Sequence, residues 1–232
     1  MQELFTRGLP GRHKKFKKTE VGYIPEDWGL QSIDNLKIKM IDGDRGKNYP
    51  KENELLDEGC CVFLTNKNIV NGDFNFSLVK FISKELDKRL RAGKLQVGDI
   101  VLTTRGSVGN LTIFSDEVPF QSVRINSCML ILRNYEANFH SGFLLNVLKK
   151  CFECNFMSNL ASGSAQPQLP VSSLRHLKLI KPSMEEQKVI FGTIETVESY
   201  VRIYRIQLDK LIYSKSALMQ VLLTGEVRVK GV

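Results

Sequence analysis

The stretch "MEEQKVIFGTIETVESYVRIYRIQLDKLIYSKSALMQVLLT" (184–224) decides the fold, because apolar residues recur through it at alternating spacings of four and three. The repeat holds for more than four heptads, and Lys215 is its one polar member. This pattern is typical of a helix that packs along a seam against another long helix. The apolar members of the predicted dimer seam are Ile190, Ile194, Val197, Val201, Tyr204, Leu208, Leu211, Leu218 and Leu222.

The start and the stop of this helix are both marked in the sequence. Ser183 is a natural N-cap, and Glu186 stands three residues on, as in a capping box. Gly225 is the predicted stop. A helix from 184 to 224 would be roughly 60 Å long at 1.5 Å per residue.

A helix of this length cannot bury its seam against its own domain, which would be about 35–40 Å across. The partner helix is expected to come from another molecule, most economically a second copy of this chain. The alternative is a long helix that folds back on its own domain.

Two further zones precede the helix. Residues 1–20 are expected to form the end of a short helix and then a basic linker. Residues 21–183 contain short β-branched and apolar runs bounded by Gly, Asn, Asp and Pro, with helical patterns at 141–160 and 83–92. We therefore expect an α+β fold: one globular domain with a curved, mainly antiparallel sheet, followed by the coiled-coil helix of 184–232.

The composition favours a polyanionic partner. The 232 residues carry a net charge of +8 with a pI near 9.2. Half of that charge lies in residues 1–20, which are either a solvated linker or an arm that contacts phosphates. The sequence has no apolar run long enough for a membrane span and no secretory signal, so we expect no membrane association and a cytoplasmic location.

Signatures of catalysis and of metal binding are mostly missing from the sequence. It lacks a Walker loop, a dinucleotide-binding glycine motif and a nucleophile elbow. His13, His140 and His176 stand in unrelated contexts, and Cys151 and Cys154 form a single C-x-x-C without the second pair of a zinc site. The spacing in "EEQK" (185–188) occurs in nucleases, but here the helix cap explains it. We expect no catalytic residue, no metal and no cofactor.

Polar and basic residues instead gather in four loops: "DGDRGKNYPK" (42–51), "LTNKNIVNG" (64–72), "TTRGSVGN" (103–110) and "PFQSVRIN" (119–126). Asn, Gln and Arg match the donors and acceptors of base edges, and Lys and Ser suit phosphates. Ordinary solvated turns are the alternative for each loop taken alone. The candidate DNA-binding residues are Arg45, Lys47, Asn48, Tyr49, Lys51, Asn66, Lys67, Asn68, Arg105, Ser107, Asn110, Gln121 and Arg124.

Four segments together resemble the specificity subunit of Type I restriction-modification systems. They are "GYIPEDWGLQSI" (22–33), "LQVGDIVLTTRGSVGN" (95–110), "ASGSAQPQLPVSSLRHLKLIKPSMEEQKVI" (161–190) and "LMQVLLTGEVRV" (218–229). The resemblance implies a target recognition domain at 21–183 and a conserved spacer helix at 184–232, which would serve dimerisation and bind a methyltransferase subunit. It implies a non-catalytic subunit that brings an adenine methyltransferase to double-stranded DNA, together with a restriction subunit where the system includes one. S-adenosylmethionine would then be bound by the partner.

This sequence departs from the usual plan of that family. Such subunits usually carry two recognition domains joined by two antiparallel helices. This sequence has one domain and one long helix, so it is either a truncated product or a half-subunit. We favour a homodimer that reads a bipartite, palindromic site, because site symmetry mirrors protein symmetry. Alternatives are a coiled-coil adaptor that binds RNA or protein, and a stand-alone nuclease.

The two ends of the sequence support the half-subunit hypothesis. "MQELFTRGLPG" (1–11) and "MQVLLTGEVRV" (219–229) share Met, Gln, Leu and Thr at the same four offsets. The chain therefore resembles one unit of a repeat, cut at the same phase at both ends.

Overall fold

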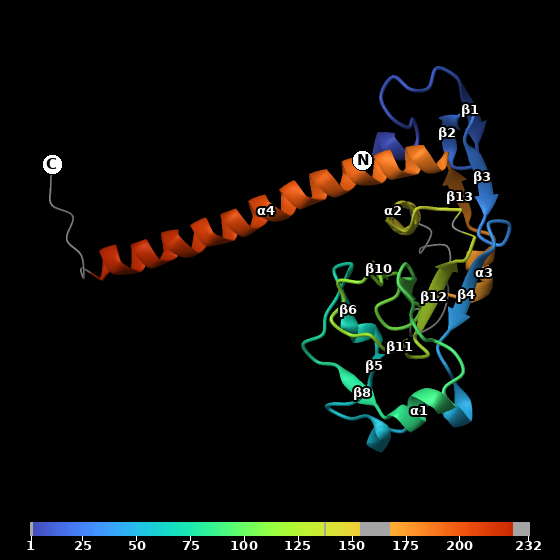
Figure 1. The fold of residues 1–232 in the computed structure, drawn as a ribbon. Coiled ribbons are helices and arrows are strands. Elements are labelled where there is room, and N and C mark those ends of the chain that lie inside the picture. The colour runs from blue at the N-terminus through green and yellow to red at the C-terminus, as the bar shows by residue number, and fades with distance from the viewer. Residues whose placement is uncertain (1, 137, 154–167, 225–232) are drawn as a thin grey trace, which may run out of the picture. The chain divides into compact units, whose positions relative to one another are not determined.

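The computed structural model describes residues 2–136, 138–153 and 168–224 (Figure 1). The chain divides into two compact units, Met1–Lys188 and Val189–Val232. The first unit mixes short strands, mostly antiparallel, with short helices, and α4 (Met184–Leu223) runs on into the second. The predicted α+β fold with a long C-terminal helix is confirmed.

A four-stranded antiparallel sheet lies at the centre of the first unit. Its strand order is β10 (Leu111–Ile113), β9 (Ile100–Thr103), β12 (Met129–Asn134) and β4 (Ile38–Asp42). In the register, Met129 pairs with Thr103 at one end of β12, and Leu130 beside it pairs with Asp42. The ends of β4 and β9 and the start of β12 therefore lie at one edge of this sheet.

A second sheet contains three strands, in the order β11 (Val123–Ile125), β5 (Cys61–Leu64) and β8 (Lys80–Ile82). β11 and β5 are parallel, whereas β5 and β8 are antiparallel. Alternate residues of both sheets meet in one buried apolar cluster, in which Leu64 and Ile125 pack with Val101 and Ile131. The two sheets thus share a core.

Three two-stranded antiparallel pairs complete the strands described. They are β1 (Phe16–Thr19) with β2 (Gly22–Pro25), β3 (Gly29–Ser32) with β13 (Lys178–Lys181), and β6 (Ile69–Val70) with β7 (Asp73–Phe74).

The N-terminal segment packs against the rest of the first unit. It begins with η1 (Gln2–Phe5), whose Phe5 is buried beside Phe143 with the ring centroids 6.0 Å apart. The basic run then enters the β1–β2 hairpin, where the Lys17 ammonium donates to the carbonyls of Glu26 and Trp28.

Two of the short helices, α1 and α2, lie at predicted positions. α1 (Lys84–Arg89) is capped by Ser83, whose Oγ accepts the amide N–H of Leu86. α2 (Ser141–Cys151) begins where predicted; part of the 141–160 prediction, and Cys154 of the C-x-x-C, lie outside the described residues. The remaining helices are α3 (Val171–Arg175), η2 (Gly46–Asn48), η3 (Glu52–Glu54) and η4 (Asn66–Asn68).

The first turn of α4 confirms one half of the predicted capping box and corrects the other. The Ser183 Oγ accepts the amide N–H of Glu186 at 3.3 Å. The Glu186 carboxylate does not close the box, because it is buried and bonded to Trp28 and His13. The helix cap therefore does not account for Glu186 in "EEQK".

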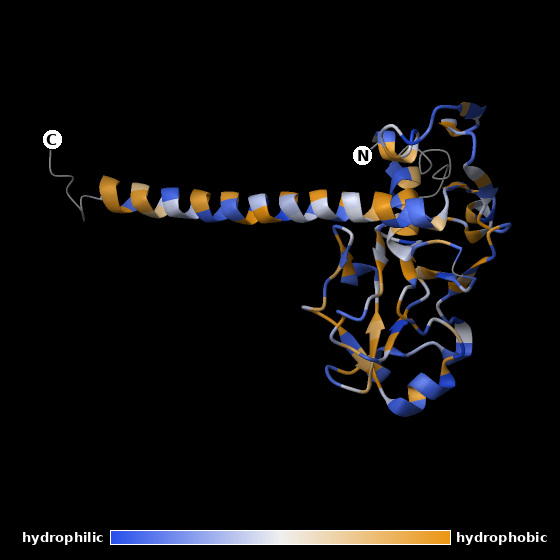
Figure 2. Ribbon diagram, turned by 45° about the horizontal axis from the view of Figure 1, so that its top comes forward, coloured by the Kyte–Doolittle hydropathy of each residue, from blue (hydrophilic) through white to orange (hydrophobic). Residues whose placement is uncertain are grey.

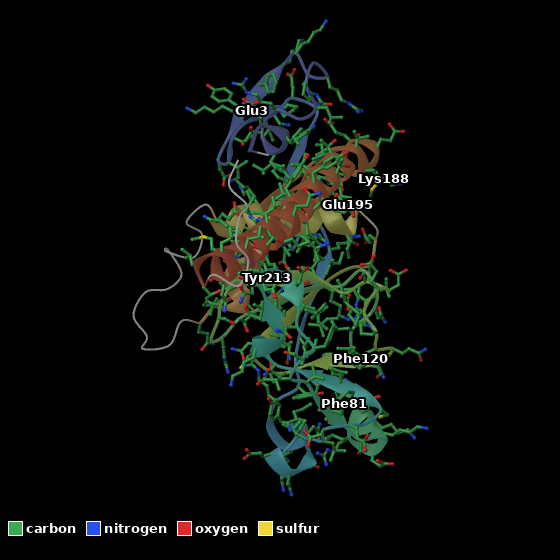
Figure 3. All side chains as sticks on the ribbon, turned by 90° about the vertical axis from the view of Figure 1, so that its left-hand side faces the viewer. Glu3, Phe81, Phe120, Lys188, Glu195 and Tyr213 are labelled. Atoms are coloured by element: carbon green, nitrogen blue, oxygen red, sulfur yellow. The ribbon has the colours of Figure 1, made fainter. Side chains whose placement is uncertain are left out.

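The second unit is the rest of α4, and hydrophobic and hydrophilic residues alternate along it (Figure 2). Ile190 and Ile194 are buried, whereas the seven apolar seam residues from Val197 to Leu222 are between 43% and 67% exposed. Glu195 and Tyr213, labelled in Figure 3, also lie on this helix, and Tyr213 is exposed. An apolar stripe therefore stays open to solvent for most of the helix. None of the described helices is long and apolar enough to cross a membrane.

Candidate nucleic-acid interface

Three of the four predicted loops begin at strand ends that lie close together in the first unit. Loop 42–51 follows the end of β4, loop 103–110 follows the end of β9, and loop 64–72 follows the end of β5. β5 ends at Leu64, which pairs with Ile125 at the end of β11, and the chain starts β12 only four residues later. The register of both sheets thus brings these loops together, although they are distant in the sequence.

The segment Asn126–Cys128, which joins β11 to β12, links the three loops. The Asn126 amide donates to the Leu64 carbonyl at 2.9 Å, and the Cys128 carbonyl accepts the amide of Thr104 at 2.8 Å. A Cβ on Gly43 would lie 2.1 Å from the Asn126 carbonyl oxygen, so the first loop can approach only because residue 43 is glycine. Sequence reasoning did not single out Asn126, because a polar residue at a strand end gives no sign of what it joins.

The first loop exposes basic side chains and packs against the fold through Tyr49. Arg45, Lys47 and Lys51 are exposed, and Asn48 is half-buried. Arg45 forms a surface ion pair with Asp42 at 3.1 Å. Tyr49 packs edge-on against Phe63 with the ring centroids 5.8 Å apart, and its burial raises the pKa of the phenol.

The second and third loops are bonded to each other. The Asn66 side-chain amide donates to the Arg105 carbonyl at 3.2 Å, and the Ser107 hydroxyl donates to the Asn66 carbonyl at 3.4 Å. The Asn110 side-chain amide donates to the Ser107 carbonyl at 3.3 Å. Lys67 is exposed and points to no acidic partner among the described residues.

The side-chain amide of Asn68 is buried and bonded to backbone groups of its own turn. Asn68 is 3% exposed, and its side-chain amide donates to the carbonyls of Asn75 and Leu78, both at 3.0 Å. Its Oδ1 accepts the backbone N–H of Thr65 at 2.9 Å. These bonds close the turn after β5 and leave little of the amide for a base.

The Arg124 guanidinium is also bonded within the fold. Arg124 is 6% exposed in the middle of β11, and its guanidinium donates to the Asp87 carboxylate at 2.5 Å. Its other bonds go to the carbonyls of Ala92, Asp87 and Leu90 at the end of α1. Arg124 therefore fixes α1 against β11, which disfavours a contact with DNA.

Gln121 is exposed but lies before β11, at the opposite end of that strand from the three loops. It follows Phe120, which packs against Phe81 with the ring centroids 5.8 Å apart (Figure 3). The structure therefore does not bring Gln121 together with the other candidates.

The charges of the converging loops are open to a ligand. Lys47, Lys51, Lys67 and Arg105 form no salt bridge with any residue that the structure describes. The one ion pair in loop 42–51, between Arg45 and Asp42, is exposed, and such pairs contribute about 0–1 kcal/mol. A phosphate would therefore meet little competition for these cations.

A second polar cluster, which sequence reasoning missed, surrounds the Glu186 carboxylate. Glu186 Oε1 lies 2.7 Å from His13 Nε2, and Oε2 accepts the indole N–H of Trp28 at 3.1 Å. Arg12 Nε lies 3.9 Å from Glu186 Oε2, and the Asp27 carboxylate lies 3.1 Å from His13 Nδ1. We call this group the Glu186 cluster.

The Glu186 cluster has the composition of a metal site, since one imidazole and two carboxylates offer ligand atoms within 4.8 Å of one another. However, each nitrogen of His13 already faces a different carboxylate, and a metal would have to break these pairs. Arg12 also places a positive charge beside Glu186. We therefore interpret the cluster as an anchor between the N-terminal segment and the first turn of α4.

Comparisons with known proteins give consistent matches. The family model of the Type I restriction modification DNA specificity domain matches residues 25–212. The Type I restriction enzyme MjaVIII specificity subunit of Methanocaldococcus jannaschii is 27% identical over 239 residues, which cover 100% of this chain and 53% of that protein. The putative type I restriction enzyme MjaX specificity subunit of the same organism is 29% identical over 99% of this chain and 50% of its own length. This chain thus spans about half the length of these curated relatives.

Solved structures share the fold. A chain from a structure that concerns complex assembly and conformational transition of the type I R-M system has a TM-score of 0.64 and 15% identity, and the match covers 87% of this chain and 46% of that chain. The HsdS subunit from Thermoanaerobacter tengcongensis has a TM-score of 0.59 and 15% identity, with 91% of this chain and 48% of that chain covered.

Proposed function

Since this chain belongs to the family of Type I restriction modification DNA specificity domains, we propose that it recognises a DNA sequence and directs a partner methyltransferase subunit to it. The observation that carries the proposal is the convergence of loops 42–51, 64–72 and 103–110 at one edge of the two sheets. Lys47, Lys51, Lys67 and Arg105 in these loops form no salt bridge with a described residue. In this account Lys47, Lys51 and Lys67 contact phosphates, and Arg105 reads a base. The chain itself carries out no bond chemistry.

The partner supplies the reaction. A methyltransferase subunit flips an adenine out of the duplex and binds S-adenosylmethionine. Where the system includes a restriction subunit, it joins the same assembly. The complex works in the cytoplasm on double-stranded DNA.

The DNA-binding part of the proposal is tested with the chain in complex with its methyltransferase subunit. Binding of a labelled duplex should weaken steeply with salt. Replacing Lys47, Lys51 and Lys67 with Ala should reduce the slope of log K against log salt by about 0.9 for each phosphate that the variant no longer neutralises. Binding that is independent of salt, or equal for RNA and duplex DNA, would instead favour the adaptor hypothesis.

We further propose that two copies of the chain pair along the exposed seam of α4. Seven apolar residues in a heptad spacing are open to solvent on this helix, and a second identical helix is the simplest cover for them. A two-fold dimer would present two identical domains in inverted orientation, so its bipartite DNA site would be a gapped palindrome.

The dimer is tested by analytical ultracentrifugation at micromolar concentration. Leu208→Glu with Leu211→Glu should yield monomers. Ile203→Glu with Ile206→Glu is the matched control, because these residues have the same spacing and similar exposure but lie outside the seam. A wild-type monomer, or a dimer that survives the Leu208 and Leu211 changes, would overturn this arrangement.

A further inference from the structure

Two side chains and one glycine tie the turn that carries Arg105 to a loop of the other sheet. Asn66 follows β5 in the three-stranded sheet, and Arg105 follows β9 in the four-stranded sheet. The Asn66 amide donates to the Arg105 carbonyl at 3.2 Å, and the Ser107 hydroxyl donates back to the Asn66 carbonyl at 3.4 Å. The two bonds run in opposite directions, so together they fix both the separation and the orientation of the loops.

The space around this contact fits Asn66 closely. Gly106 has φ +75°, a conformation that favours glycine, and a Cβ on it would lie 2.2 Å from the Asn66 side-chain nitrogen. Asn66 therefore packs directly against the bare backbone of residue 106. The Asn66 side chain and the turn formed by Arg105, Gly106 and Ser107 are therefore in close contact.

The backbone of Arg105 is also held from other directions. Its amide donates to the Cys128 carbonyl at 3.3 Å, and residue 105 forms a β-bridge with Gln168. Its guanidinium, in contrast, has no hydrogen bond or ion pair with the described residues. A fixed backbone with an unengaged side chain is the arrangement that positions a base-reading arginine.

Asn66 itself is badly placed to read a base. A bidentate contact with adenine needs the side-chain oxygen and an N–H aimed at the same base edge, but this nitrogen faces the Arg105 carbonyl. We propose that Asn66 is a positioning residue, which acts on DNA through Arg105 and makes no specific base contact of its own. This inference rests on the proposed function, because it assumes that Arg105 contacts a base.

The test uses the chain in complex with its methyltransferase subunit and a duplex that contains the methylated site. Every base pair of the site is substituted in turn, and the affinity is measured for wild type, Asn66→Ala, Arg105→Ala and the double variant. Arg105→Ala should lower affinity between about fivefold and about 150-fold, the range for one bidentate base contact, and relax discrimination at one base pair. Asn66→Ala should relax discrimination at that same base pair, and in the Arg105→Ala background it should have no further effect.

Lys67→Ala is the matched control, because Lys67 lies in the same turn, is exposed and makes no bond to the Arg105 turn. It should weaken binding to all sequences equally and add to the effect of Arg105→Ala. Thermal melting of each variant checks the fold, and Ser107→Ala, which removes only the return bond, should give a weaker form of the Asn66→Ala result.

Relaxation at a different base pair in Asn66→Ala, or an effect that adds to Arg105→Ala, would show that Asn66 reads DNA directly and would overturn the inference. Failure of the proposed function looks different, because the wild-type complex itself would then neither bind nor methylate a specific sequence.

Discussion

The Glu186 cluster leads to a sharp prediction about stability. Glu186→Ala removes the acceptor of the buried Trp28 indole and one of the two carboxylates that face His13. A buried donor left without its acceptor costs about 1–3 kcal/mol, and the lost hydrogen bond to His13 costs about 0.5–1.5 kcal/mol more. We therefore expect a loss of about 2–4 kcal/mol.

Trp28 is the only tryptophan in the chain and is 1% exposed, so its fluorescence reports directly on this cluster during urea unfolding. A loss of about 3 kcal/mol should move the urea midpoint down by about 1 M or more, given m-values of about 1–3 kcal/mol per molar. Glu186→Gln should lose less, because its amide oxygen can still accept the indole N–H of Trp28.

The matched control is Glu185→Ala, which changes the neighbouring, exposed carboxylate in the same first turn. It should cost only the interaction with the helix dipole, about 0.3–1 kcal/mol. Equal midpoint shifts for the variants at 185 and 186 would refute the idea that the buried carboxylate anchors the N-terminal segment.

Three other residues of the first unit give further predictions. Gly43→Ala places a Cβ against the Asn126 carbonyl and should destabilise the fold by about 1–3 kcal/mol, measured by urea unfolding. Arg124→Ala removes the side-chain donor of three carbonyls and one of the two cations that bond to the Asp87 carboxylate. It should lower stability by about 3–5 kcal/mol, and a neutral effect would contradict its structural role. Burial raises the pKa of the Cys61 thiol to about 11, so this thiol stays neutral at pH 8 and its thiolate forms only as the pH rises towards 11. An alkylating reagent at pH 8 should therefore modify the exposed Cys60 before Cys61, and mass spectrometry would detect the order.

The sequence is sufficient to predict those features that depend on local pattern. The seam of α4 follows from a heptad spacing, and the Ser183 cap follows from Ser183 and Glu186, which stand three positions apart. The fold class follows from alternating apolar runs between turn residues. Each of these signals lies within a few neighbouring residues.

The features that the sequence does not predict depend on contacts between distant residues. Glu186 matches a capping box, but a histidine 173 residues away takes its carboxylate. Arg124 has the residue type of a base reader, and only the packing of α1 on β11 shows that its guanidinium is used internally. Asn126 has no local signal at all, because its importance comes from the register that brings three loops to one edge.

The most direct test of the central claim is a map of methylated bases in the DNA of cells that produce this chain together with its methyltransferase subunit. We expect methylated adenines in one gapped palindrome, with identical half-sites in inverted orientation, and loss of the pattern when Leu208 and Leu211 are replaced by Glu. A site with two different halves, or a methylation pattern that does not change when this chain is omitted, would contradict it.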